Sequence, residues 1–152
     1  MTEIRAAVCT AFGQPLTIET LHLRAPGPGE VEVTLAACAI CHSDISYAEG
    51  GWGGALPAVY GHEASGRVSA VGPGVTSLRP GDPVLVTLIR SCGHCASCTG
   101  GHPTRCATPP QIAPVLTRAD GSEVAQGLNC GAFAERVVVQ QSQIAALPEG
   151  IP

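Results

Sequence analysis

The stretch that organises this chain begins with Ala39-Ile-Cys-His-Ser-Asp44 and ends with Tyr60-Gly-His-Glu63. Between its ends lies a glycine-rich loop, Gly50-Gly-Trp-Gly-Gly54, of a kind that can form the wall of a pocket. Cys41 offers a thiolate and His62 an imidazole, and a zinc ion with an open coordination position binds such groups with a third protein ligand and a water. The stretch therefore predicts part of a metal site and leaves the source of the third ligand open.

Spacing alone supports this pair weakly, because a lone Cys and a lone His this far apart are more often core or surface residues. The local pattern strengthens it. Residues 42–49 favour a short helix, which Ser43 or Asp44 would cap and which the following glycines would end. Cys41 would then stand at the helix start, where the dipole favours a thiolate. Asp44 and Glu63 are candidates to orient the imidazole and tune the ion, or else ordinary solvated acids.

A second constellation is Cys92-Gly-His-Cys95-Ala-Ser-Cys98, followed by Cys106. Thiols at this spacing can surround one tetrahedral ion, because each two-residue gap lets a chain reversal bring two sulfurs to the same centre. Four thiolates close the shell of a zinc ion and leave no position for a substrate, so this ion would be structural. Disulfides or free thiols are the less favoured alternative. His94 and His102 are other possible ligands, but the four cysteines suffice.

Composition excludes several classes of function. The net charge is −4, and the eight Lys and Arg residues are not clustered, which argues against a nucleic-acid surface. No apolar run approaches the roughly 18 residues that cross a bilayer, and the start lacks a signal-peptide pattern. A cytoplasmic chain without a membrane partner is the default, so its eight cysteines are expected to be thiols or metal ligands.

Plentiful Gly and Pro (19 and 13) and few aromatic residues indicate a turn-rich β domain with an aliphatic core. Strands are predicted at 4–9, 16–23, 30–35, 64–71, 83–89, 131–139 and 144–147. We expect Leu16, Ile18 and Leu21 to face the core, and the alternating strand at 30–35 to be half-buried. The segment 107–128 is predicted to be irregular, with a hairpin turn at 119–122, and 148–152 to be a turn.

Taken together, these motifs resemble the zinc-containing medium-chain alcohol dehydrogenases. The resemblance rests on Cys41-His-Ser-Asp44, Gly61-His-Glu63 with Gly66 and Gly72 downstream, the Cys92/95/98/106 set, and Gly131-Ala-Phe-Ala-Glu135 before Val137-Val-Val139. These motifs follow the family's order and spacing over essentially the whole chain. The resemblance implies a mainly β fold for residues 1–152: a GroES-like, partly open β-barrel with short helices and a zinc-stapled cysteine lobe at 91–107.

The resemblance also implies roles for the residues of the opening stretch. Cys41 and His62 would bind the catalytic zinc, and Ser43 would take the proton from the bound alcohol. Glu63 would be the carboxylate beside the zinc, and Asp44 a partner of His62. Hydride would then pass between the alcohol carbon and a nicotinamide, and aldehyde reduction is the same path reversed.

Two further positions concern the cofactor and the substrate. His42 stands where many members carry Arg or His near the pyrophosphate of NAD or NADP. Trp52 falls in the loop that lines the substrate cleft in relatives, or it simply packs over that loop. Ser46 departs from the family pattern, because several relatives place there a histidine that finishes the proton relay.

The family's third catalytic ligand and its Rossmann cofactor domain are expected beyond Pro152. On this hypothesis the chain by itself would hold a structural zinc but show no turnover with small alcohols. A second hypothesis is a stand-alone zinc-binding module with a structural or interaction role, in which Cys38 or the more remote Cys130 completes the site. A third is one half of a split dehydrogenase whose Rossmann half is a partner chain. The oligomeric state is left open.

Overall fold

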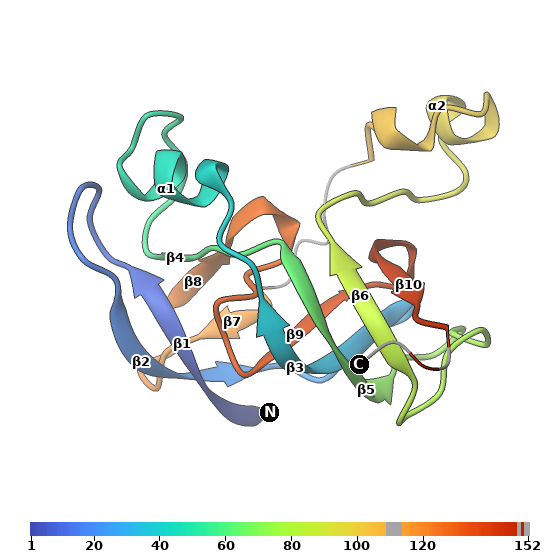
Figure 1. Cartoon of the computed structure of the whole chain (residues 1–152), viewed down its shortest axis with the longest axis horizontal. Helices are drawn as coiled ribbons and strands as arrows, with labels where there is room; N and C mark the ends of the chain where they lie inside the picture. The colour runs from blue at the N-terminus through green and yellow to red at the C-terminus, as the bar shows by residue number, and fades with distance from the viewer. Residues whose placement is uncertain (109–113, 149, 151–152) are drawn as a thin grey trace.

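Strands are the main regular secondary structure of the chain, and they form a closed barrel joined to an open sheet (Figure 1). A computed structural model describes residues 1–108, 114–148 and 150. The barrel strands, in spatial order, are β1 (Thr2–Cys9), β2 (Thr17–Leu23), β7 (Leu116–Thr117), β8 (Glu123–Gln126) and β4 (Ala58–Val59). The sheet strands, all antiparallel to their neighbours, are β10 (Ile144–Ala146), β6 (Pro83–Thr87), β5 (Glu63–Val71), β3 (Glu30–Cys38) and β9 (Arg136–Gln140).

The helices are short and lie at the edges of this β framework. They are α1 (His42–Ala48), α2 (Ala96–Thr99) and the 3-10 turns η1 (Pro103–Arg105), η2 (Gly127–Asn129) and η3 (Gln141–Gln143). In the part of the chain that the structure describes, none of the helices has the length and apolarity needed to cross a bilayer. The mainly β fold with a barrel, short helices and a separate cysteine lobe is therefore confirmed.

Strand β9 joins the two apolar cores. Val137 and Val139 pack into the core of the sheet with Val31 and Val33, whereas Val138 packs into the core of the barrel. Successive side chains of a strand point to opposite faces, so one short β-branched run contributes to both cores. This arrangement fixes the barrel against the sheet, and the candidate site lies where β3 ends and β5 begins, near α1 (Figure 1).

Strand β2 corrects one prediction. Leu21 is fully buried and Leu16 half-buried, as expected, but Ile18 is 70% exposed. Alternation along the strand places Leu21 and Leu23 on the barrel face and Ile18 on the opposite face. The predicted set was wrong because its spacing did not follow the two-residue period of a strand.

Because Ile18 and Leu21 lie on opposite faces of β2, substitutions at the two positions are expected to lower the free energy of unfolding by different amounts. Ile18→Thr is expected to change the free energy of unfolding by no more than about 0.5 kcal/mol, because the side chain is exposed. Leu21→Ala removes a buried side chain from the barrel core and should cost about 2–5 kcal/mol. Urea unfolding of both variants checks this, and a cost for Ile18→Thr as large as that for Leu21→Ala would contradict the assignment of faces.

Strand β3 is buried more completely than the alternating pattern indicated. Glu30 and Glu32 are only 4% and 6% exposed, because β3 lies between β5 and β9. Both carboxylates are paired: Arg24 Nη2 donates to Glu30 Oε1 at 2.8 Å, and Arg136 Nη1 to Glu32 Oε1 at 2.9 Å. Burial by itself raises the pKa of Glu30, but the hydrogen bonds from Arg24 and Gly27 outweigh burial and lower it.

Two segment boundaries also differ from expectation. The segment predicted to be irregular contains β7 and β8, and the predicted hairpin turn between them is confirmed by a hydrogen bond from Arg118 N to Ser122 O. The last long strand begins at Arg136 rather than 131, because Phe133 bonds instead to Ala7 and Tyr60. Residues 109–113 of the irregular segment, and 149, 151 and 152 of the predicted final turn, lie outside the described residues.

Candidate metal centres

Helix α1 begins at a cysteine. Cys41 is its N-cap residue, with φ −88° and ψ 153°, and neither of the predicted caps, Ser43 and Asp44, occupies that position. Asp44 lies three residues further on, and its Oδ2 accepts a hydrogen bond from Cys41 N at 3.0 Å. A carboxylate at this position reaches back to the first N–H of the helix, as in a capping box. The predicted end is confirmed, since the helix closes at Glu49 and Gly50 follows with φ +84°.

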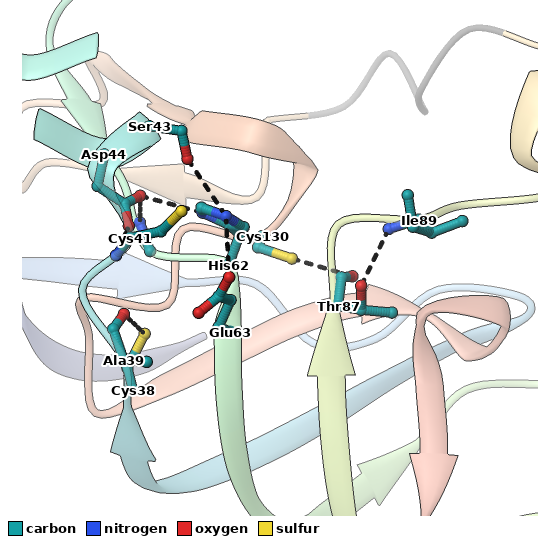
Figure 2. A network of polar contacts seen from close by, with 11 residues as sticks. Cys38, Ala39, Cys41, Ser43, Asp44, His62, Glu63, Thr87, Ile89 and Cys130 are labelled. Atoms are coloured by element: carbon teal, nitrogen blue, oxygen red, sulfur yellow. Dashed lines mark hydrogen bonds and ion pairs between the residues drawn. The ribbon is translucent and has the colours of Figure 1, made fainter. Parts of the chain in front are cut away.

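Asp44 connects the helix to the histidine. Its side chain is 3% exposed, and its Oδ1 accepts from Gly61 N at 2.9 Å and lies 3.1 Å from His62 Nδ1. Figure 2 shows this carboxylate between the start of α1 and the imidazole. The pairing assigns the imidazole proton to Nδ1 and leaves the lone pair of Nε2 available for a metal ion.

The ligand atoms of Cys41, His62 and Glu63 all lie within 4.8 Å of one another. His62 is buried, while the Glu63 side chain is 52% exposed and its Oε1 lies 3.8 Å from His62 Nε2. Ser43 Oγ lies 3.4 Å from the same nitrogen (Figure 2). Thiolate, imidazole and carboxylate are all groups that bind zinc, so this donor set fits the ion.

The two remaining predicted site residues lie at the periphery. His42 is exposed on the first turn of α1. Trp52 is 62% exposed, and its ring meets the ring of Tyr47 edge-to-face at a centroid distance of 5.1 Å. Tyr47 in turn stacks on Tyr60. Trp52 thus packs against helix α1, and roles in cofactor or substrate contact remain predictions for both residues.

Neither alternative third ligand joins the group around Cys41. The Cys38 Sγ lies 3.4 Å from Ala39 O, and burial raises the pKa of this thiol (Figure 2). Cys130 is fully buried and donates to Thr87 O at 3.2 Å, and burial raises its pKa to about 12. Among the described residues, the third ligand-type group beside Cys41 and His62 is therefore Glu63.

The cysteine lobe follows β6 and projects away from the sheet (Figure 1). The sulfurs of Cys92, Cys95, Cys98 and Cys106 lie within 4.8 Å of one another, and all four residues are half-buried. His94 and His102 are exposed and are not part of this group, as expected. His94 Nδ1 lies 2.9 Å from Cys92 O instead.

The thiols of the lobe differ sharply in acidity. A hydrogen bond from Thr108, together with backbone N–H groups, lowers the pKa of Cys92 to about 5. Burial raises the pKa of Cys98 to about 11. Sulfurs this close repel each other as thiolates, and a divalent cation at their centre removes that repulsion. The chemistry of the four donors thus fits a zinc ion.

Sequence reasoning missed three contacts of these sites. The hydrogen bonds that Asp44 accepts from Cys41 N and Gly61 N were not predicted, although the Cys41-x-x-Asp44 spacing is that of a capping box. The hydroxyl of Thr108 on Cys92 had no sequence signal, because nothing in the spacing indicates that residue 108 folds back onto residue 92.

Comparison with known proteins places these features in context. Residues 27–149 match the family model described as "Alcohol dehydrogenase GroES-like domain". An alcohol dehydrogenase of Moraxella sp. is 36% identical over 97% of this chain, and an S-(hydroxymethyl)glutathione dehydrogenase of Paracoccus denitrificans is 33% identical over 97%. These alignments cover 41% and 42% of the relatives.

Solved structures agree with the sequence relatives. An alcohol dehydrogenase zinc-binding domain protein from Burkholderia ambifaria superposes with a TM-score of 0.91 at 34% identity, over 99% of this chain and 43% of that one. Benzyl alcohol dehydrogenase from Acinetobacter calcoaceticus gives a TM-score of 0.86 at 28% identity, over 100% and 43%. The chain thus spans about two-fifths of the length of the relatives it matches.

Proposed function

The chain belongs to the family of alcohol dehydrogenase GroES-like domains, and from this premise we propose that it is the catalytic domain of a zinc-dependent alcohol dehydrogenase. The proposed reaction interconverts small alcohols and aldehydes or ketones with NAD or NADP. The observation that carries the proposal is the convergence of Cys41, His62 and Glu63 beside a hydroxyl. We propose that the domain occupies residues 1–152, with the zinc lobe at 91–107.

The residues around Cys41 and His62 have two proposed roles, metal binding and proton transfer. A zinc ion held by Cys41 and His62 would supply a Lewis acid for the oxygen of the substrate. In the described chain, Glu63 supplies the third ligand-type group, a carboxylate oxygen beside the sulfur of Cys41 and the nitrogen of His62. Its side chain is half-exposed, which lets the carboxylate approach or leave the other two groups. Asp44 holds His62 in one orientation and one tautomer.

Ser43 is proposed to receive and pass on a proton. Its Oγ lies 3.4 Å from His62 Nε2, so the hydroxyl borders the place where an ion and a substrate oxygen would sit. The side chain is half-buried on α1, and a proton it receives can leave toward the exposed side of that helix. Ser46 is not proposed as the next proton acceptor, because a serine hydroxyl, unlike an imidazole, is not a base at neutral pH.

Relatives support a nicotinamide cofactor. One solved relative is described as an NAD-dependent alcohol dehydrogenase and another as a putative zinc-binding dehydrogenase bound to NADP. We propose that a cofactor domain, in the same protein or in a partner chain, places the nucleotide against this face. His42 would meet its pyrophosphate, and Trp52 would border the substrate. The thiolates of the lobe suit a reducing compartment such as the cytoplasm.

Metal analysis of the purified chain tests the proposed centres. Cys41→Ser is expected to remove about one zinc ion per chain and to leave the lobe loaded, because the first site loses its thiolate. Cys38→Ser is the matched control, since Cys38 neighbours the site but is not one of its ligands. Retention of all zinc in Cys41→Ser, or loss of zinc in Cys38→Ser, would contradict the assignment.

Substrate class is tested with the cobalt-substituted chain. Benzyl alcohol or trifluoroethanol should perturb the visible spectrum of cobalt in the wild type and not in Cys41→Ser. An unperturbed wild-type spectrum at saturating alcohol would argue against an alcohol site.

A further inference from the structure

One sulfur of the cysteine lobe has an unusually complete set of hydrogen-bond donors. Cys92 Sγ accepts from Cys95 N at 3.2 Å and from His94 N at 3.5 Å. Its third donor is a side chain, Thr108 Oγ1, at 3.0 Å. In the described part of the chain, Thr108 carries the only hydroxyl that bonds a sulfur of the lobe. The closest of the three donors is therefore also the one that a substitution can remove.

Thr108 is itself held in place. Its carbonyl oxygen accepts a hydrogen bond from Arg90 Nη2, and Arg90 is half-buried just before the lobe begins. Ser91 N donates to Ser142 Oγ at 3.0 Å, which ties the same entry point to the body of the domain. The chain thus enters the lobe at Arg90 and leaves it at Thr108, and these two points are bonded together.

Other threonines of the lobe do not act on a sulfur. Thr99 Oγ1 donates to the backbone oxygens of Cys95 and Ala96 inside α2, and the Thr104 side chain is exposed on η1. The contact of Thr108 with Cys92 is therefore specific to its position, and Thr104 provides a matched control in the same lobe.

We propose that Thr108 is a positioning residue for the metal of the cysteine lobe: its hydroxyl orients the Cys92 sulfur and withdraws charge from it. The inference rests on the proposed zinc in this lobe. Four thiolates around a divalent ion leave an excess negative charge, and hydrogen-bond donors disperse it. A sulfur that is held in one orientation stays on the metal, so Thr108 protects the bond from Cys92 to the metal.

The experiment compares Thr108→Val with Thr108→Ser and Thr104→Val. All are made in the full chain with Cys41→Ser, so that the lobe sulfurs are the thiolates that bind cobalt. Thr108→Val should weaken cobalt retention against a chelator by about 10- to 100-fold. It should also move the sulfur-to-cobalt charge-transfer band to longer wavelength, because the sulfur becomes more electron-rich. Thr108→Ser should restore both properties, and Thr104→Val should match the parent.

The possible results distinguish a failure of the proposed Thr108 role from a failure of the proposed metal lobe. If the parent chain shows no charge-transfer band, or Cys106→Ser leaves both the band and the cobalt affinity unchanged, the metal lobe itself is refuted. If the band is present but Thr108→Val leaves its position and the cobalt affinity unchanged, the role of Thr108 is refuted. Equal weakening by Thr104→Val would also refute it, since that side chain bonds no sulfur. Should Thr108→Val fail to fold by circular dichroism, Thr108→Ala replaces it and is judged by the same criteria.

Discussion

Asp44→Ala is expected to abolish metal binding at Cys41 and His62 and to destabilise the whole domain. The carboxylate is 3% exposed and is the acceptor for Cys41 N, Gly61 N and His62 Nδ1. A buried backbone N–H left without an acceptor costs about 1–3 kcal/mol, and Gly61 N is such a group, whereas Cys41 N is only partly buried and adds less. The imidazole also loses the bond that fixes its tautomer and orientation.

Asp44→Asn separates charge from shape. The amide oxygen can still accept hydrogen bonds from Gly61 N and His62 Nδ1. The amide nitrogen would face Cys41 N, and two hydrogen-bond donors cannot bond to each other. We expect a folded variant with weakened metal binding, intermediate between wild type and Asp44→Ala. The measurements are zinc content per chain and the midpoint of thermal unfolding.

Asp120→Ala is the control for these variants. Asp120 is exposed, and among the described residues its carboxylate accepts hydrogen bonds only within its own turn, from Ser122. Its removal should leave the zinc content unchanged and alter unfolding only slightly. If Asp44→Ala keeps its full zinc content and a wild-type midpoint, the proposed link between the helix start and the histidine is wrong.

Gly72→Ala is expected to prevent folding or to destabilise the domain by more than about 3 kcal/mol, beyond ordinary overpacking. A Cβ at this position would lie 1.8 Å from Gly27 O, a backbone atom that no rotamer change can move. The backbone here is also bonded, since Gly72 N donates to Glu30 O at 2.8 Å. Glu30 belongs to β3, an inner strand of the sheet, so the clash is transmitted to its core.

Gly51→Ala is the matched substitution, because a Cβ there would lie 3.4 Å from its nearest neighbour, Ser46 O. Guanidinium unfolding followed by far-ultraviolet circular dichroism compares the two variants. A loss of stability in Gly72→Ala no greater than that in Gly51→Ala would show that the turns around Gly27 and Gly72 can separate at little cost. Gly66, also part of the family resemblance, is restricted similarly, with a Cβ 2.2 Å from Thr34 O.

The spacing of residues in the sequence was sufficient to predict those features whose interacting residues lie close together in the chain. The four lobe cysteines, the short helix after Cys41 and the hairpin at 119–122 were predicted correctly for this reason. The longer strands followed from β-branched runs, but the short strands β4, β7 and β8 were missed. The face of Ile18 was wrong because its assignment departed from the two-residue period. The burial of Glu32 depended on strands that pair with β3 from distant parts of the chain.

The amino-acid sequence by itself indicated the four cysteines of the lobe, the pair of Cys41 and His62, and the mainly β character of the domain. It could do so because ligand chemistry and strand periodicity are properties of short segments. Only the tertiary structure decided that Asp44 serves Cys41 and His62 at once, that Glu63 rather than Cys38 completes their group, and that Thr108 returns to Cys92. Asp44 meets His62, and Cys41 meets Glu63, where segments distant in the chain pack together, and Thr108 meets Cys92 where the lobe closes on itself. No local pattern encodes these approaches.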